Sequence, residues 1–346
     1  MEDFIVAAVK VLVAFAFLLV TVMLLIWAER RIVAFMQNRL GPNRAGPIGI
    51  LQTLADGVKL MFKESISPDR ADMFLYLAAP VMALIPAFLI FLVIPIGAPI
   101  IVGDTTYTLQ VTDLNVGVLY ILAMSSVAVY AITFAGWSSG SKYPLLGSVR
   151  ASAQMISYEA AMGLALVPVI MFNGTASLAD IVEAQGATYF GWIPAWNIVL
   201  IPSFIVFLIA AFAETNRAPF DLVEAEQEIV GGFHTEYSGL RFALFFLAEY
   251  INMFNMAALT VTLFLGGWQG PVFGPTFLVW ILPVFWFLLK TFFVIFFFIW
   301  VRGTLPRMRY DQLMAFGWKR LIPISLAWII LSMVAVGVRR FGLQWA

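Results

Sequence analysis

Eight long apolar stretches dominate this sequence of 346 residues. A helix needs about 20 mostly apolar residues to cross the hydrocarbon core of a bilayer. Hydrophobic residues make up 62% of the chain and charged residues 12%, whereas soluble domains have roughly 45–50% and 25%. The sequence therefore predicts an all-α, polytopic membrane protein, with residues 1–346 forming a single integral membrane domain. Eight transmembrane helices are expected at about residues 5–28, 74–96, 115–136, 153–172, 197–213, 241–266, 276–301 and 320–338.

The distribution of Lys and Arg predicts how these helices are oriented. The first, third, fifth and seventh connections hold seven, two, two and five basic residues, which is sixteen of the twenty in the chain. The second, fourth and sixth connections hold none. Because short cytoplasmic loops carry the excess of Lys and Arg, we expect the odd-numbered connections to be long cytoplasmic loops and both termini to lie outside.

Cysteine and histidine usage limits the redox chemistry of the chain. There is no cysteine, and His234 is the only histidine. Thiolate-bound iron–sulfur clusters and bis-histidine haem therefore cannot be built from this sequence. If the protein takes part in redox chemistry, a partner or a substrate must hold the electrons.

The first connection contains a helical pattern that follows two Gly-Pro breaks. An apolar face and a polar face alternate at helical spacing from residue 50 onward. This pattern predicts an amphipathic helix after the first span, which either lies in the membrane interface or turns its polar face toward an internal cavity. The apolar face holds Leu51, Leu54, Val58 and Met61, and the polar face holds Gln52, Asp56, Lys59 and Lys63.

The fifth connection concentrates acids on the side of the membrane where bases are expected. Only Arg217 offsets them, and Asp221, Glu224 and Glu228 would share one face of a helix. Like charges this close oppose joint ionisation. A solvated acidic loop is the alternative, but it does not explain acids on a basic face, so we interpret the cluster as functional. Its members are Glu214, Asp221, Glu224, Glu226 and Glu228.

Three ionisable residues lie well inside predicted spans: Glu159, Glu249 and Lys290. Each costs at least about 2.5–3.5 kcal/mol if it faces lipid at the bilayer centre, so we expect them to face the interior of the bundle. Asn252 and Asn255 extend a polar stripe from Glu249. The three are candidates for a proton relay or an ion site, and a structural Glu–Lys pair is the alternative.

Four long strings in the cytoplasmic connections carry a family resemblance. They are ERRIVAFMQNRLGPNRAGPIGILQTLADGVKLMFKE (29–64), GSVRASAQMISYE (147–159), AETNRAPFDLVEAEQEIVGGFHTEYSG (213–239) and RGTLPRMRYDQLMAFGWK (302–319). They resemble the H-subunit family of proton-pumping NADH:quinone oxidoreductase, respiratory complex I, over essentially the whole chain.

The resemblance implies a membrane subunit that is not active alone and carries no redox centre. It would form much of a quinone tunnel and couple quinone reduction to proton pumping. Quinone would be the substrate, and partner subunits would hold FMN and the iron–sulfur clusters. Expected partners are peripheral-arm subunits, which carry the terminal cluster and the ligands of the quinone head group, and small membrane-arm subunits. The location would be a bacterial inner membrane with periplasmic termini, or the mitochondrial inner membrane for an organellar homologue.

The resemblance also assigns residues to these roles. The acid chain toward the membrane arm would contain Asp56, Glu159, Glu214, Glu224, Glu228 and Glu249, with Asp221, Glu226 and Glu236 as additions. The quinone tunnel would contain Arg30, Arg39, Asp56, Phe242, Phe246 and Arg302.

Three other functions fit parts of the same pattern. Buried Glu and Lys also suit a stand-alone cation/proton antiporter, although its gating does not need such elaborate cytoplasmic loops. The equivalent subunit of a membrane-bound hydrogenase would differ in its co-purifying partners. A purely structural anchor leaves the buried carboxylates unexplained.

Overall fold

The structure is a computed structural model that describes residues 2–102, 105–189, 193–221, 230–273 and 275–341. The predicted relay residues Glu224 and Glu228, and the added Glu226, lie outside the described residues. Long helices make up most of the described residues, which confirms the all-α class. The helices are α1 (Glu2–Met36), α2 (Gln52–Phe62), α3 (Met73–Phe91), α4 (Gly117–Ser138), α5 (Lys142–Asn173), α6 (Leu178–Ala184), α7 (Ile201–Glu214), α9 (Gly239–Phe264), α10 (Thr276–Thr304), α11 (Tyr310–Phe316) and α12 (Ile322–Phe341).

Seven helices of the described chain are long and apolar enough to cross a membrane. They correspond to seven of the eight predicted spans: α1, α3, α4, α5, α9, α10 and the continuous segment of α11 and α12. The remaining predicted span, 197–213, is represented by α7, an apolar helix of 14 residues. Such a helix is about 21 Å long at 1.5 Å per residue. A count of seven is therefore observed by length and composition, and the eighth crossing stays a prediction.

Two helices extend beyond their predicted ends into polar sequence. The first predicted span ends at residue 28, but helix α1 continues to Met36. Glu29, Arg30 and Arg31 therefore lie within the helix. Helix α5 begins at Lys142, well before the predicted residue 153. One face of this start is buried, at Pro144, Gly147 and Ser148, and close packing holds it there. A Cβ at Gly136 of α4, for example, would collide with Ser148 of α5.

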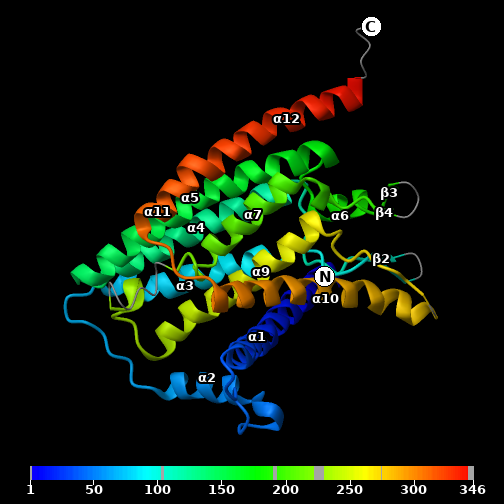
Figure 1. Cartoon of the computed structure of the whole chain (residues 1–346). Helices are drawn as coiled ribbons and strands as arrows, with labels where there is room; N and C mark the ends of the chain where they lie inside the picture. The colour runs from blue at the N-terminus through cyan, green and yellow to red at the C-terminus, as the bar shows by residue number, and fades with distance from the viewer. Residues whose placement is uncertain (1, 103–104, 190–192, 222–229, 274, 342–346) are drawn as a thin grey trace.

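The connections add a few short elements. One antiparallel ribbon joins β1 (Ile100–Val102) to β2 (Thr105–Tyr107), and a second joins β3 (Thr188–Tyr189) to β4 (Ile193–Pro194). Short 3-10 helices occupy Pro47–Gly49, Asn197–Val199 and Gly232–His234, and a π-helical turn occupies Gly317–Leu321. Both ribbons lie at the same end of the bundle, away from α2 (Figure 1).

The core of the bundle is built around α3, α4, α5, α7 and α9. Helix α3 packs on α4 and α9, α4 packs on α5, and α5 packs on α7. Helix α12 runs along α5 on one side of the bundle, and α1 lies on the opposite side next to α9 and α10 (Figure 1). This arrangement brings the start of α9, the end of α7 and the polar end of α1 together.

Candidate functional site

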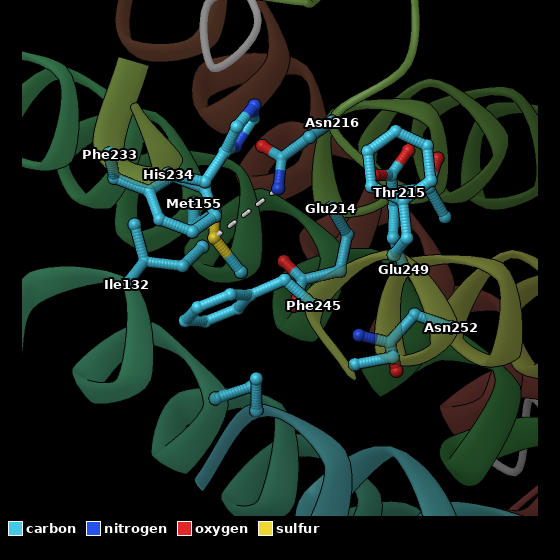
Figure 2. Close-up of a pocket in the computed structure, with 14 residues that line it drawn as sticks. Ile132, Met155, Glu214, Thr215, Asn216, Phe233, His234, Phe245, Glu249 and Asn252 are labelled. Carbon is cyan, nitrogen blue, oxygen red and sulfur yellow. Dashed lines mark hydrogen bonds between the residues drawn. The ribbon is translucent and has the colours of Figure 1, made fainter. Parts of the chain in front are cut away.

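A cavity of about 50 Å³ lies where the end of α7 meets α3, α4, α5 and α9. Figure 2 shows Glu214 pointing into this space, near Met155 and Phe245. The cavity therefore combines apolar walls with a few polar groups, which is the usual composition of a ligand or proton site. The polar lining residues are Glu214, Thr215, Asn216, His234, Glu249 and Asn252.

An ion network connects this cavity to α1 and α10. Glu29 accepts hydrogen bonds from Arg217, at 2.9 Å, and from Arg302. Arg217 also pairs with Glu249 at 2.8 Å, and its guanidinium lies 4.4 Å from the ring centroid of Tyr250. The side chains of Arg217 and Glu29 are only 5% and 6% exposed. Two carboxylates and two guanidinium groups thus balance their charges in a site from which most water is excluded.

Glu214 lies beside this network without a comparable partner. It is 3% exposed, and its Oε2 atom is buried with no hydrogen-bond partner among the described residues. Glu159, on α5, is close enough to act on it electrostatically. A buried carboxyl group is stable when it is neutral or well hydrogen-bonded. Glu214 is therefore a group whose charge should respond strongly to nearby changes.

Glu159 is held by two hydroxyl groups from the neighbouring helix. Ser125 of α4 donates to its Oε1 atom at 2.9 Å, and Ser126 donates to the same atom. Donors of this kind stabilise a carboxylate in a poorly hydrated place. The contact brings Glu159 of α5 against α4, so this carboxylate is held between two helices, as its cost in lipid had predicted.

Gln154 positions the loop that carries Glu214 and Arg217. Its side chain is fully buried and donates to the carbonyl oxygens of Ala213, at 3.0 Å, and Phe220, at 2.8 Å. These bonds tie both ends of the loop to α5. Asn216, between them, adopts a positive φ of 50°, a backbone conformation that Asn tolerates better than most residues. Gln154 thus holds the loop against α5, and Asn216 permits its turn.

The predicted tunnel residues fall into two groups. Arg30 of α1 pairs with Asp56 of α2 at 2.5 Å. Partial burial alone would raise the pKa of Asp56, but hydrogen bonds from Arg30 and Gln52 outweigh it and lower that pKa. Arg39 lies beyond the end of α1, is exposed, and donates to Gln37. The structure does not bring Arg39 to the ion network.

The aromatic residues and Arg302 lie nearer the cavity. Phe242, Phe246 and Tyr250 follow one another at i, i+4 and i+8 on α9, with centroid distances of 4.7 and 6.3 Å. Phe246 lines the cavity, and Tyr250 lies under Arg217. This aromatic row leads from His234 to the network that contains Arg302.

His234 is neutral in this environment. Burial lowers its pKa to about 4, and its ring meets Phe233 and Phe242 edge-on. Its place in the polar fifth connection favours a surface or hydrogen-bonding residue over a catalyst. The structure places it in the cavity wall, opposite Glu214.

Lys290 does not join the acids. Its ammonium group donates to the carbonyl oxygens of Leu265, Gly267 and Gln269, at 2.8, 3.1 and 2.6 Å. Leu265 lies sixteen residues beyond Glu249 along the chain of α9, which is about 24 Å along the helix axis. The partners that Lys290 has in the described chain are thus backbone oxygens and not the carboxylate of a structural Glu–Lys pair. A relay role for Lys290 remains a prediction.

Comparison with known proteins identifies the family. A family model described as NADH dehydrogenase matches residues 9–333. The chain is 54% identical to the NADH-quinone oxidoreductase H-subunit of Frankia alni and to the protein of the same name from Frankia casuarinae. Each match spans 324 residues, 93% of this chain and 70% of the relative. The chain belongs to the H-subunit family of NADH-quinone oxidoreductases. Family membership and the apolar helices make it an integral membrane protein.

Within this H-subunit chain, two central residues of the site were not predicted. The sequence assigns no role to Glu29, and Arg217 enters only as the one base that offsets nearby acids. Both are the middle members of the ion network. Glu29 directly follows the apolar run of the first span, and the helix continues through it. A charged residue at that place in a continuous helix is the sequence signal that could have identified it. The partner of Arg217 could not be read from the sequence, because Glu29 is 188 residues away.

The predicted site residues otherwise divide by location. Glu214 and Glu249 line one cavity, and Glu159 lies near it. Asp221 follows the Gln154-bound loop, and Glu236 accepts a hydrogen bond from Tyr76 at its backbone carbonyl. The residues that the structure describes contain no group of three or more His, Cys, Asp or Glu side chains suited to hold a metal ion.

Proposed function

We propose that this chain is the membrane subunit of a proton-translocating NADH:quinone oxidoreductase, and that it couples quinone reduction to proton pumping. The observation that carries the proposal is the ion network from Arg302 through Glu29 and Arg217 to Glu249. This network connects the predicted tunnel side of α10 to the cavity that contains Glu214. The relatives named as NADH-quinone oxidoreductase subunits supply the reaction.

The chemistry of the reaction requires the protein to manage charge. Two electrons from a cluster in a partner subunit reduce the quinone, and two protons complete the quinol. The phenyl rings of Phe242 and Phe246 offer an apolar wall for the quinone in the tunnel. Arg30, Asp56 and Arg302 supply charges near its path. Reduction makes the quinone strongly basic, so it draws protons from its surroundings.

The carboxylates then respond to that change of charge. A shift of one pKa unit corresponds to about 1.36 kcal/mol, and interactions in a site with little water are strong. Proton uptake at the quinone would disturb Glu228, Glu224 and Glu214 in turn. Glu214 passes the disturbance to Glu159 and Glu249 and onward to neighbouring membrane-arm subunits. The proximity of Glu159 to Glu214, and of Glu249 to the same cavity, supports this order.

The cavity is suited to proton movement between these groups. Its buried Glu214 Oε2 and Asn252 Oδ1 atoms have no protein partner among the described residues. A polar cavity of this size can hold water that bonds to such atoms. A water chain between Glu214 and Glu249 would carry a proton across the cavity.

The membrane arrangement completes the proposal. We infer that α7 makes the eighth crossing, that residues 1–346 form one membrane domain, and that both termini are periplasmic. Helix α2 would lie at the cytoplasmic interface, because Leu51, Leu54 and Met61 are all exposed on its apolar face. Asp56, on its polar face, is turned toward α1 and pairs there with Arg30, whereas Lys59 is exposed.

Replacing Glu214 by Gln in the assembled complex tests the relay. The amide keeps the size of the side chain but cannot gain or lose a proton, so we expect the number of protons pumped per NADH oxidised to fall severalfold. Proton pumping is measured in proteoliposomes together with inhibitor-sensitive NADH:quinone reduction. Glu183→Gln, at an exposed acid outside the cavity, is the matched control and should pump normally. Normal pumping by the Glu214 variant would overturn the relay role.

A further inference from the structure

A second, larger hollow lies far from the acid cavity, beside the N-terminal half of α1. Its volume is about 310 Å³, which is at the lower end of the range of about 300–1,000 Å³ typical of small-molecule sites. One wall is formed by α1, a second by the end of α3 and the segment 108–111, and Val284 of α10 contributes a third. Val9 and Val13 are half or more exposed along its edge. The groove therefore opens to the surroundings of α1.

The polarity of the groove changes along its length. Lys10, Thr108 and Gln110 are its polar lining residues, and Lys10 bonds to the other two. Phe17 lines the deeper part, about 10 Å further along α1 at 1.5 Å per residue. Phe17 stacks on Phe91 at 5.6 Å, which closes the floor against the core. One end thus carries a cation and the other is lined by aromatic and aliphatic carbon.

The charge of Lys10 is directed at the polar end. Its ammonium group donates to the carbonyl oxygen of Gln110 at 3.1 Å and to the hydroxyl of Thr108 at 3.4 Å. Both of these partners are neutral oxygens, so they do not cancel the positive charge. A long Lys side chain that reaches a membrane interface can bind an anionic head group.

The geometry points to a binding site for one phospholipid with an anionic head group, on the membrane face that carries the N-terminus of α1. Its phosphate pairs with Lys10 at the polar end, and an acyl chain fills the groove toward Phe17. A neutral quinone head group would not use the charge of Lys10. The apolar floor excludes a purely ionic ligand such as free phosphate. This site is independent of the proposed coupling function.

Lipid retention by the complete assembly tests the site. The assembly is purified through a tag on this chain in mild detergent, and retained phospholipids are counted by mass spectrometry. Val13→Trp fills the groove, so we expect it to lose one tightly retained phospholipid. Leu12→Trp is the matched control, because Leu12 is 67% exposed at the same depth of α1 but does not line the groove. The control should retain the lipid.

Lys10→Met tests the head group and keeps the groove open. Phosphatidylglycerol added to the delipidated assembly should bind about fivefold more weakly to this variant. This is the loss of affinity expected when one positive charge near an anionic lipid head group is removed. Phosphatidylcholine should bind both proteins equally, and inorganic phosphate should displace neither lipid. Equal lipid loss in the two Trp variants would overturn the proposal. A photo-crosslinker at Val9 that captures a neighbouring protein or a quinone, instead of a phospholipid, would also overturn it.

Discussion

At the scale of single residues, Arg217 joins the buried carboxylate of Glu29 to the half-buried carboxylate of Glu249. It contacts Glu29 through one nitrogen and Glu249 through another, while the ring of Tyr250 covers its face. Arginine suits this position because its planar guanidinium forms several directed hydrogen bonds and stacks on aromatic rings. Removal of the guanidinium would leave negative charge in a place with little water.

We expect Arg217→Met to lower the free energy of unfolding by about 3–5 kcal/mol, the cost of breaking a buried ion pair. Thermal unfolding of the purified assembly measures the effect as a fall in Tm. Arg309→Met is the control, because Arg309 pairs with Asp311 while both are largely exposed, and such pairs contribute about 0–1 kcal/mol. Similar Tm values for the two variants would contradict a structural role for the network.

A second residue-scale prediction concerns the pH dependence of stability. The pKa of His234 is about 4 in the folded chain because of burial, against 6.5 ordinarily. Between these values the unfolded chain binds a proton that the folded chain does not. The contribution of neutral His234 is therefore fully present above about pH 6.5 and is lost as the pH falls toward 4.

The measurement is the change in Tm between pH 7 and pH 5. We expect Tm to fall more in the natural protein than in His234→Gln, which cannot titrate in this range. Carboxylates that titrate below pH 5 contribute equally to both proteins. An equal fall in the two would show that His234 is not buried as a neutral group.

At the scale of elements, the end of α9 depends on a cation from α10. Lys290 donates to three carbonyl oxygens just beyond the last turn of α9 and lies 4.4 Å from the ring centroid of Trp196. Carbonyl groups at the end of a helix lack partners within the helix, and a cation there also interacts favourably with the helix dipole. Gly266 turns the chain at a positive φ of 72°, where a Cβ would collide with Trp196.

Lys290→Met is expected to destabilise the assembly by about 2–3 kcal/mol, because several carbonyl groups lose a charged donor. The ratio of protons pumped to NADH oxidised should stay normal in the protein that assembles. Lys290→Arg should restore part of the lost Tm. A variant with normal Tm and defective pumping would instead favour the relay role that the sequence indicated.

At the scale of the whole molecule, the position of α7 decides the topology. Seven helices of the described chain are long enough to cross a bilayer, and α7 is shorter. If α7 crosses, the connections before and after it lie on opposite faces of the membrane, which agrees with the alternation of basic residues. If it does not, that alternation would be broken at the fifth connection.

Single cysteines test this directly, because the chain has none of its own. We expect a membrane-impermeant maleimide to label Glu183→Cys in intact cells. Val230→Cys should react only after the membrane is disrupted. Asn115→Cys and Tyr143→Cys flank the 22-residue helix α4 and provide a control for one crossing. Labelling of both α7-flanking positions from the same side would exclude the eighth crossing.

Much of the candidate site could be predicted from the sequence. Glu159 and Glu249 stood out because charge inside apolar sequence is costly unless it faces the interior, and Glu214 stood out as part of an acid cluster on a basic face. The structure places Glu214 and Glu249 on one cavity. Glu29 and Arg217 were missed because their importance comes from a contact between distant segments. Lys290 was selected for the same reason, because a charge in apolar sequence is costly. Its partners are backbone carbonyl oxygens, and a pattern of side chains in the sequence cannot identify these.

The sequence by itself determined the helical membrane class, the family and the approximate position of most spans. Hydrophobicity and charge act on each segment locally, so they can be read without knowing the neighbours. Only the tertiary structure decided which charges meet: Arg217 with Glu29 and Glu249, Arg30 with Asp56, and Lys290 with the end of α9. Those pairings follow from the packing of helices that are far apart in the chain. The low-dielectric interior strengthens the buried pair of Arg217 and Glu29 most.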